Sequence, residues 1–428
     1  MHIRFATIED KDEILKLYKD AIGSKGCTWD EDYPGEKDLC NDISGANIIC
    51  MINDTDEIVS ALSVDEDPAV DELDVWNKEL APAAEFARMV VREDYRGKKI
   101  PERMIEFFLA VLEVRGFKSA HYLVSPNHKR ALAAYKGAGF NKVGECHVYD
   151  KDWLCYEKKI RPDTTGERLL TGYFGKKIWR KFIKAVEEYR LIESGDRIAV
   201  CISGGKDSML LAQLLKMAAV HHVFDFTPEY IMLDSGYSKE NLEKVMTNAE
   251  KIGINIHIYK ENLFDNVEEI GGNPCFFCSR MRRGTLYRRA KELGCNKIAL
   301  GHHYNDVVET ILMGVVYGAQ VQTMLPKLRS ENVEGMELIR PLYLVREKDI
   351  LDWQEMMEMK FVKCACRVAV SDGMEDTARL RVRRIIEELS KENDAVENNI
   401  FGSVMNVNLK KIMGYQKEGE HHDFLEDY

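Results

Sequence analysis

The sequence predicts an α/β protein of two domains, the second of which is built on a doubly wound parallel sheet. Its 428 residues exceed what one ordinary hydrophobic core holds. In the second part of the chain, short apolar runs alternate with segments of helical periodicity, a pattern typical of parallel strands covered by helices. A glycine-rich turn, SGGKDS, joins one of these apolar runs to the helical segment that follows it.

The domain boundary is expected near residue 160. Residues 161–175 are rich in Pro, Thr and Gly and lack sustained periodicity, so we interpret them as a linker between a first domain, 1–160, and a second, 176–428. The net charge of −12 divides into −9 for residues 1–160 and −3 for the rest. This acidity argues against a surface that coats nucleic acid generally, although a local basic groove remains compatible with it.

The composition also restricts the cellular setting. The amino-terminal residues contain no apolar core of a signal peptide, and no apolar stretch reaches the roughly 18 residues needed to cross a bilayer. We therefore expect a cytoplasmic protein without membrane contact. The cysteines number eleven, which favours reduced thiols or metal ligands over a disulfide framework.

Strands and helices are expected to alternate along the second domain. Strands are predicted at 197–202, 229–233, 255–259 and 297–300, and helices at 176–189 and 208–220. Ligands of doubly wound sheets bind at the carboxyl ends of the strands, and SGGKDS directly follows the first of these strands. A ligand site is therefore expected at this edge of the sheet.

The loop SGGKDS has the chemistry of an anion site. Its glycine pair lets the backbone approach a phosphate closely, the helix after it offers unpaired N–H groups, and Lys206 adds a full positive charge. Asp207 suits a magnesium ion or the helix N-terminus. The loop lacks the Walker spacing GxxxxGK[ST]. The expected phosphate-binding residues are Ser203, Gly204, Gly205, Lys206, Asp207 and Ser208.

Two cysteine pairs have the spacing of metal ligands. Cys275 and Cys278 precede an arginine-rich run, and Cys364 and Cys366 follow about 90 residues later. Four thiolates could close a structural zinc site. Three could instead hold an iron–sulfur cluster and leave one iron open. Spacing alone leaves both alternatives open.

SGGKDS after a strand resembles the PP-loop of ATP pyrophosphatases, which split ATP to AMP and pyrophosphate. The run PCFFCSRMRRGTLYRRAKELGCNKIALGHHYNDVVET, residues 274–310, is similar to the TtcA family, the tRNA 2-thiocytidine synthetases. The similarity continues through residues 317–328 and 339–350. The resemblance implies a domain that uses ATP, Mg²⁺ and a [4Fe-4S] cluster on three cysteines to replace the C2 oxygen of a cytidine with sulfur.

Carried over by position, the resemblance assigns the cluster ligands. Cys275 and Cys278 are two of them. Cys364 is the expected third, because it aligns with the first cysteine of a C-x-x-C pair in the family, whereas this chain has C-x-C and Cys366 is the alternative. The expected catalytic residues are Lys206, Asp207, Cys275, Cys278 and Cys364.

The resemblance also assigns further contacts to the nucleotide and the RNA. The residues expected near the nucleotide or substrate are Leu233, Asp234, Gly301, His302 and Asp306, whereas a capping or core role is equally open for His303. Arg280, Arg282 and Arg283, followed by Arg288 and Arg289, are expected to face the RNA backbone. A second basic group, at Arg379, Arg381, Arg383 and Arg384, is interpreted as a solvated helix face.

Residues 1–160 have a different order of elements. Strand-like runs at 86–91 and 119–124 flank an amphipathic helix at 101–115, and PNHKRALAAYKGAGF covers 126–140. This order resembles the GNAT acetyltransferase fold, in which a turn of type R-x-x-G-x-G/A binds the pyrophosphate of coenzyme A. The resemblance predicts a GNAT-like α/β domain at the amino terminus.

The turn itself departs from the family pattern. The match begins at Arg96, but Lys99 and Pro101 occupy the two glycine positions. Tyr135 matches the usual general acid of the family, and packing on a helix explains it equally well. Two interpretations remain for this domain: an acetyltransferase that uses acetyl-CoA, or a degenerate module that binds RNA, a partner chain or a regulatory ligand. The two departures favour the second.

The sequence therefore predicts an ATP-dependent tRNA sulfurtransferase. Its expected partners are a tRNA with an anticodon-loop cytidine, a sulfur donor such as a cysteine desulfurase, and a second copy of the chain in a homodimer. A base must be unstacked for chemistry on its edge, so a single-stranded loop suits the site. The alternatives are a PP-loop adenylating RNA-modifying enzyme with structural zinc, and a non-catalytic nucleotide or acyl-CoA sensor. The complete SGGKDS loop argues against the sensor.

Overall fold

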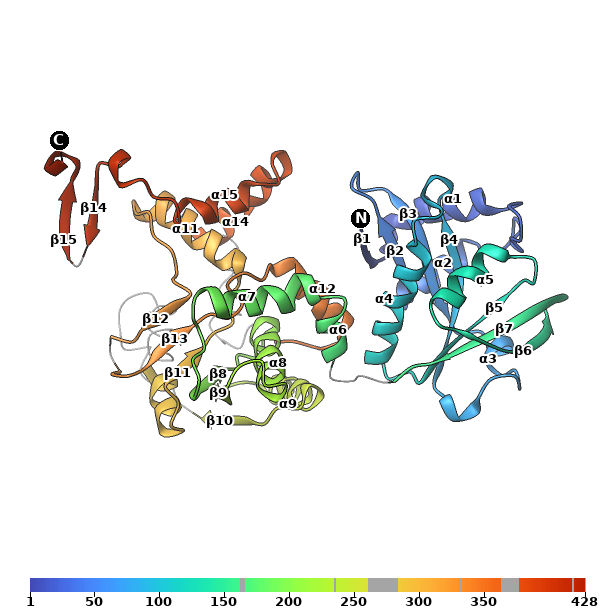
Figure 1. The fold of residues 1–428 in the computed structure, drawn as a ribbon, viewed down its shortest axis with the longest axis horizontal. Coiled ribbons are helices and arrows are strands. Elements are labelled where there is room, and N and C mark those ends of the chain that lie inside the picture. The colour runs from blue at the N-terminus through green and yellow to red at the C-terminus, as the bar shows by residue number, and fades with distance from the viewer. Residues whose placement is uncertain are drawn as a thin grey trace. The chain divides into compact units, whose positions relative to one another are not determined.

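The computed structural model describes residues 1–161, 166–234, 236–260, 284–331, 333–362, 377–417 and 419–427. The chain forms two compact units, whose elements Figure 1 shows. Unit 1 comprises Met1–Gly175 with Asp352–Glu358, and unit 2 comprises Lys176–Leu351 with Met359–Tyr428. Among the described residues, no helix is both long and apolar enough to cross a membrane.

Unit 1 is built on a seven-stranded sheet of order β1-β2-β3-β4-β5-β7-β6. Its strands are β1 (His2–Phe5), β2 (Ile48–Ile52), β3 (Ile58–Asp65), β4 (Ala83–Val91), β5 (Ser119–Val124), β6 (Asn141–Val148) and β7 (Lys151–Lys159). Its helices are α1 (Lys11–Ala21), α2 (Glu36–Ser44), α3 (Pro68–Asp71), α4 (Ile100–Val114), α5 (Lys129–Gly137) and α6 (Glu167–Thr171). The strands predicted at 86–91 and 119–124 and the helix predicted at 101–115 are present as β4, β5 and α4.

The pairing of β4 with β5 determines where unit 1 can hold a ligand. These two strands are the one parallel pair among the strand pairs of the sheet. Their register covers only Ala83–Glu85 opposite Ser119–His121, although β4 continues to Val91. Beyond Glu85 the two strands therefore separate inside the sheet.

Residues 166–175 differ from an open linker. They contain α6, and the side chains of Leu169, Leu170 and Phe174 are at most 1 % exposed. Composition suggested a linker because Pro, Thr and Gly dominate the run. Its three large apolar residues nevertheless bury their side chains in a compact unit, since burying each one stabilises the fold by about 1.5–3 kcal/mol.

Unit 2 is built on a six-stranded sheet of order β10-β9-β8-β11-β13-β12, with a separate hairpin near the carboxyl terminus. Its strands are β8 (Asp196–Cys201), β9 (Phe226–Asp234), β10 (Ile256–Lys260), β11 (Lys297–Ala299), β12 (Lys327–Arg329), β13 (Glu337–Ile339), β14 (Gly414–Lys417) and β15 (Glu420–Asp423). Its helices include α7 (Arg180–Glu188), α8 (Lys206–Val220), α9 (Lys239–Ile252), α11 (Tyr304–Gly318), α12 (Glu347–Met356), α14 (Ala378–Glu392) and α15 (Val396–Ser403), and residues 284–292 are also helical.

The predicted doubly wound sheet is confirmed. All neighbouring strands of the six-stranded sheet are parallel except β12, which pairs antiparallel with β13 at one edge. The chain passes from β8 to β9 and β10 on one side and returns to β11 on the other side of β8. The loops after β8 and β11 therefore meet at the point where the strand order reverses, which is the usual ligand site of such sheets.

Two features of unit 2 help to form the ligand site expected at this edge of the sheet. Helix α8 begins at Lys206, two residues earlier than its periodicity predicts, because Gly205 already has the extended backbone of an N-cap residue. Most of its side chains are buried, as expected of an apolar helix enclosed by other elements. Helices α11, α14 and α15 lie side by side (Figure 1) and bring the carboxyl-terminal part of the chain toward the loop after β11.

Candidate active site

The turn from β8 into α8 requires glycine at one position for two reasons. Gly204 has φ +76°, a conformation that side-chain-bearing residues rarely adopt. A Cβ at this position would lie 2.6 Å from Cγ2 of Val245 and 3.2 Å from Cγ2 of Val362. The backbone N–H of Val362 donates to the Gly204 carbonyl (3.0 Å), so two other segments hold the loop in place.

The two serines of the loop are engaged with the loop itself. Oγ of Ser208 accepts a hydrogen bond from the Ser203 N–H (3.1 Å) and donates one to the Gly205 carbonyl (2.9 Å). The Tyr237 hydroxyl donates to the Ser203 carbonyl (3.0 Å). These contacts fix the path of the backbone. Because α8 starts at Lys206, the N–H groups of its first turn have no partner within the helix and are available to an anion.

Lys206 lies between two carboxylates. Its Nζ is 3.1 Å from Oδ1 of Asp207 and 3.0 Å from Oε1 of Glu347, the first residue of α12. Burial lowers the pKa of the lysine, but the Coulombic attraction of Asp207 and the hydrogen bond to Glu347 outweigh it, so the pKa is raised. Lys206 is therefore charged and held in one position.

The loop after β11 packs against the first turn of α8. A Cβ on Gly301 would lie 3.0 Å from the carbonyl carbon of Asp207 and 3.1 Å from the Ser208 nitrogen. These neighbours are backbone atoms, which cannot rotate away as a flexible side chain can. Only glycine lets the two loops approach this closely.

His303 and Asp306 connect the two loops. The backbone N–H of His303 donates to Oδ2 of Asp306 (3.0 Å), which caps the N-terminus of α11. The His303 ring is 3 % exposed and lies between Asp306 and Asp207, with nitrogen-to-oxygen distances of 3.5 and 3.8 Å. The sequence left a capping role open for His303. His303 is the N-cap residue of α11, and its ring also lies 3.8 Å from Asp207 of the PP-loop.

His302 is a neutral imidazole. Burial first, and then the positive charge of Arg340, lower its pKa to about 4. Its Nδ1 is buried and has no hydrogen-bond partner among the residues that the structure describes. A neutral ring next to the carboxyl end of β11 can exchange a hydrogen bond with a bound molecule without bringing a charge.

Two arginines predicted to face solvent instead join this site. Arg383 of α14 lies 2.8 Å from Oε1 of Glu309 and 3.3 Å from Oε2 of Glu347. Arg379, one helical turn earlier, lies 3.4 Å from Glu309 and 3.7 Å from Asp306. Glu309 is 2 % exposed, and although burial raises its pKa, the arginines keep it paired.

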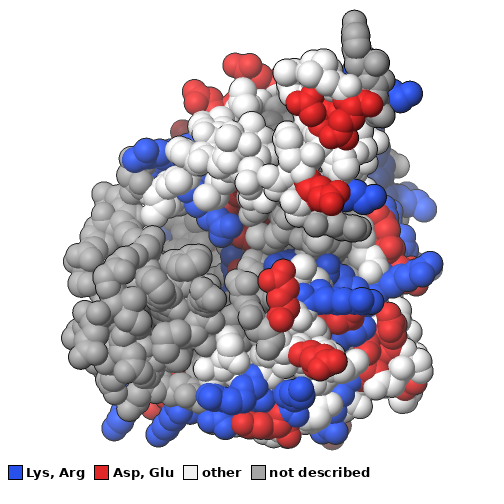
Figure 2. Space-filling view, turned by 90° about the vertical axis from the view of Figure 1, so that its left-hand side faces the viewer, with Lys and Arg blue, Asp and Glu red and all other residues white. Residues whose placement is uncertain are grey.

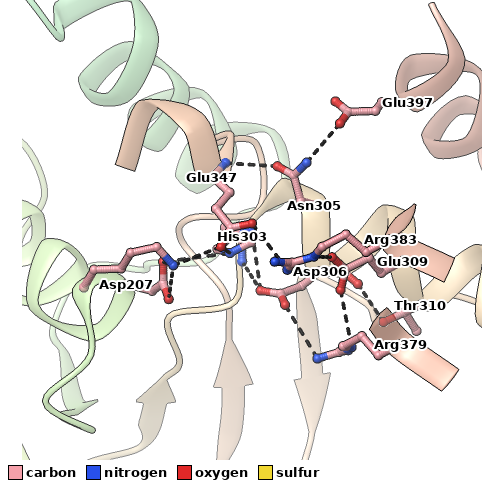
Figure 3. A network of polar contacts seen from close by, with 11 residues as sticks. Asp207, His303, Asn305, Asp306, Glu309, Thr310, Glu347, Arg379, Arg383 and Glu397 are labelled. Carbon is pink, nitrogen blue, oxygen red and sulfur yellow. Dashed lines mark hydrogen bonds and ion pairs between the residues drawn. The ribbon is translucent and has the colours of Figure 1, made fainter. Parts of the chain in front are cut away.

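These contacts close a ring of polar side chains that joins three cations, four carboxylates and the His303 imidazole, which we call the charged ring (Figure 3). The charged ring runs through Lys206, Glu347, Arg383, Glu309, Arg379, Asp306, His303, Asp207 and back to Lys206. Sequence reasoning missed Glu347 and Glu309. A signal for Glu347 existed, because it follows β13, whose carboxyl end lies at the same edge of the sheet as the PP-loop.

The remaining predicted residues of this site fall into two groups. Oδ1 of Asp234 accepts the N–H groups of Gly236 and Tyr237 (2.9 and 3.0 Å), so it shapes the turn after β9, and Leu233 before it is buried. The others lie outside the described residues; these are Cys275, Cys278, Arg280, Arg282, Arg283, Cys364 and Cys366. No cluster of three or more metal-ligating side chains occurs in the part of the chain that the structure describes.

Unit 1 contains a cavity of about 1030 Å³ where β4 and β5 separate. Glu85 of β4 lines it and is 8 % exposed, and its buried Oε2 has no hydrogen-bond partner within the described part of the chain. Burial first, and then the nearby Asp65, Asp71 and Asp67, raise its pKa to about 8. The cavity therefore contains a carboxyl group that is uncommonly easy to protonate.

The turn before α4 borders the same cavity. Lys99 has φ +55°, the left-handed conformation that the glycine expected there would supply. Pro101 is the second residue of α4, where a backbone N–H would have no partner within the helix. Tyr135 is stacked on Tyr122 with ring centroids 3.5 Å apart, which fits the packing role left open for it.

Comparison with known proteins places both units. Residues 175–388 match the PP-loop domain family, and residues 14–140 match the acetyltransferase (GNAT) family. The tRNA-cytidine(32) 2-sulfurtransferase of Coxiella burnetii is 36 % identical over 251 residues, which cover 56 % of this chain and 95 % of that protein. The chain belongs to the TtcA family of PP-loop proteins.

A second curated relative agrees with this assignment, and one similar solved structure was also found. The tRNA-cytidine(32) 2-sulfurtransferase of Geobacter metallireducens is 33 % identical over 233 residues, covering 54 % of this chain and 89 % of that protein. The solved structure of the U34-tRNA thiolase NcsA from Methanococcus maripaludis with its [4Fe-4S] cluster is 24 % identical, with a TM-score of 0.45, and the match covers 56 % of this chain and 80 % of that one. The TtcA family match and the GNAT match together account for the two units.

We expect Gly301→Ala to destabilise unit 2 by about 1–3 kcal/mol, because a Cβ forced against backbone atoms is overpacked. Gly318→Ala is the matched control: it changes a glycine of α11 whose Cβ would meet nothing within 4 Å. Urea unfolding of the full chain measures both. Equal unfolding free energies for Gly301→Ala and the control would contradict the close approach.

Glu85 should make the stability of unit 1 depend on pH. Its folded pKa of about 8 is above the ordinary 4.5, so the folded state binds the proton more tightly than the unfolded state. The free energy of unfolding should therefore fall as the pH rises from about 4.5 to 8. Glu85→Gln should remove this part of the pH dependence, measured by chemical unfolding at pH 5 and 8.

Glu57→Gln provides the control for this experiment. Hydrogen bonds, first from Asn53, lower the pKa of Glu57, so its folded state does not take up a proton between pH 5 and 8 as Glu85 does. The fall in stability should persist in this variant. A fall of equal size in Glu85→Gln would show that other groups cause it.

Proposed function

We propose that this protein is an ATP-dependent tRNA sulfurtransferase that converts a cytidine to 2-thiocytidine. The observation that carries the proposal is the complete SGGKDS loop at the switch point of a doubly wound sheet, in a chain of the TtcA family. Relatives in this family are named for cytidine 32 of tRNA, and we propose the same position here.

ATP would bind with its phosphates against the PP-loop. The N-terminus of α8 and the ammonium group of Lys206 supply positive potential, and the loop backbone at Gly204 and Gly205 allows close approach. The carboxylate of Asp207, which lies next to Lys206 in the loop, is the group that would hold a magnesium ion, because carboxylate oxygens are the ligands that Mg²⁺ prefers. Asp234 and Gly301 would border the adenosine and the reacting groups.

The chemistry would take two displacements. The C2 oxygen of the cytidine attacks the α-phosphorus of ATP, the bond to the β-phosphate breaks, and pyrophosphate leaves. A sulfur nucleophile then attacks C2, the C2–O bond breaks, and AMP carries the oxygen away. Lys206 would neutralise charge on the phosphates during the first displacement, which is the main contribution a protein makes to phosphoryl-group chemistry.

The sulfur would be held at an iron–sulfur site. Cys275, Cys278 and Cys364 are the proposed ligands of a [4Fe-4S] cluster, with Cys366 as the alternative third ligand. A cluster held by three thiolates supplies one iron with an open coordination position for exogenous sulfur. A cysteine desulfurase is the proposed class of sulfur donor, and a homodimer the proposed assembly.

The tRNA would contact a limited basic region. Arg280, Arg282 and Arg283 are the proposed phosphate contacts. On the face drawn in Figure 2, Lys and Arg side chains gather along the lower edge, with acidic side chains among them. A locally basic surface of this kind suits one loop of RNA better than a long duplex, because affinity for nucleic acid depends on the number of phosphates neutralised.

Anaerobic purification with iron and labile-sulfide analysis tests the cluster. We expect about four irons per chain in the parent and their loss in Cys275→Ala, together with loss of tRNA thiolation. The control is Cys295→Ala, which removes a buried cysteine of unit 2 from outside the two pairs.

The opposite result has a definite meaning. About one zinc and no labile sulfide would replace the cluster with a structural tetrathiolate site. The protein would then be a PP-loop adenylating enzyme with a different acceptor. Full thiolation by Cys364→Ser with its cluster intact would instead overturn the third ligand alone.

The cavity of unit 1 favours a second function, transfer of an acetyl group from acetyl-CoA to an amine. Asp65, Asp67 and Glu85 line the cavity and would attract a cationic acceptor. Glu85, with a pKa of about 8, could take the proton that the amine must lose before it attacks the acetyl carbonyl. Lys99 has the backbone conformation that the coenzyme-binding turn needs.

Acetylation assays with spermidine and with a lysine peptide test this function. Glu85→Gln should slow transfer by about 100-fold, as expected for loss of a general base, and should leave acetyl-CoA affinity within about twofold. Titration calorimetry of the full chain with acetyl-CoA gives the affinity. Absence of acetyl-CoA binding at roughly 1 mM would reject the activity and leave a ligand-binding module.

A further inference from the structure

The carboxylate of Glu347 bridges two cations that belong to different parts of unit 2. Its Oε1 lies 3.0 Å from Nζ of Lys206 in the PP-loop, and its Oε2 lies 3.3 Å from the Arg383 guanidinium on α14 (Figure 3). The backbone of Glu347 is also held in place, because its N–H donates a hydrogen bond to Oδ1 of Asn305 (2.9 Å). Burial raises the pKa of Glu347, but the contacts with Lys206 and then with His303 and Arg383 lower it overall.

Every lysine and arginine of the charged ring is already paired with a carboxylate, so a phosphate must compete for it. The cations of the ring are Lys206, Arg379 and Arg383, and its carboxylates are Asp207, Asp306, Glu309 and Glu347. Lys206 is the cation of the ring that belongs to the anion-binding loop, and it is already held by two carboxylates. A polyphosphate that approaches Lys206 therefore competes with Glu347 or Asp207.

We propose that Glu347 is a positioning residue that holds Lys206 in the nucleotide-free protein. When phosphates bind, Glu347 releases Lys206 and keeps its ion pair with Arg383. This inference rests on the proposed function and adds an exchange of partners to it. Asp207 follows Lys206 directly in the chain and keeps His303 as a second neighbour, whereas Glu347 already has a separate oxygen on Arg383. Glu347 can therefore release Lys206 and remain paired.

The exchange explains why an anion-binding loop tolerates a carboxylate beside its lysine. An unpaired Lys206 would sample several rotamers, and fixing it on binding would cost conformational entropy. Glu347 fixes the ammonium group in advance. Arg383 keeps the charge of Glu347 compensated afterwards, which lowers the repulsion between this carboxylate and the incoming phosphates.

Calorimetric titration of the full-length protein with magnesium and the α,β-methylene analogue of ATP tests the exchange. Glu347→Gln removes the competing charge, so the analogue should bind about threefold to tenfold more tightly. Arg383→Gln leaves Lys206 as the one lysine or arginine within 4 Å of Glu347 among the described residues, so the analogue should bind about tenfold more weakly. The double variant lacks the Glu347 carboxylate, so Arg383 is no longer needed to compensate it, and the analogue should bind within about threefold of Glu347→Gln.

Asp349→Asn is the matched control. Asp349 is in the same first turn of α12 and has a similarly exposed side chain, at 17 % against 21 % for Glu347, but it pairs with Lys177. Both substitutions remove the same favourable interaction with the helix dipole. The control should bind the analogue within about twofold of the parent. Thermal unfolding of every variant checks that the chain remains folded.

The recovery of affinity in the double variant distinguishes the exchange from damage to the fold, because the losses from two damaging substitutions would add rather than cancel. A double variant as weak as Arg383→Gln alone would overturn the exchange and make Arg383 a direct phosphate contact. If the parent binds no nucleotide, the proposed function and this inference both fail. If the parent binds ATP and thiolates tRNA while all variants bind alike, only the exchange fails.

Discussion

The close approach of the loop after β11 to the first turn of α8 is the constraint on which the rest of unit 2 depends. Gly301 permits it, since a Cβ would press on backbone atoms of Asp207 and Ser208. The approach places the N-terminus of α11 beside the PP-loop, and α11 in turn receives the arginines of α14. One site thus brings together four segments that are distant in sequence: the first turn of α8, the N-terminal parts of α11 and α12, and α14. They meet because the two loops touch without a side chain between them.

The charged ring illustrates how a partly buried set of charges can be stable and still respond to a ligand. Each carboxylate has a cation within 4 Å, so the cost of desolvation is offset by close pairing. Several members have two partners. A residue with two partners can lose one to a ligand without becoming an uncompensated buried charge, and this property separates a site that exchanges contacts from a purely structural ion pair.

Local patterns predicted most of the fold, whereas long-range contacts were beyond them. The strands and the SGGKDS loop follow from periodicity and glycine placement within a few residues. Lys206 and Glu347 are 141 residues apart, so nothing near either residue indicates their contact. For the same reason Arg383 was interpreted as solvated: its helix carries acids at 387 and 388, and the carboxylates it meets come from α11 and α12. Composition was also misleading at 166–175, where three apolar side chains outweigh the turn-forming residues around them.

The early end of the β4–β5 pairing has a consequence for the backbone as well as for side chains. An interior strand ordinarily satisfies its amide and carbonyl groups on both sides. Beyond Glu85, β4 keeps β3 on one side, and no strand among the described residues pairs with the other. That side is a strand edge inside the sheet. Its peptide groups need hydrogen-bond partners from side chains, water or a bound molecule. An extended molecule with amide groups of its own could dock there as a further strand would.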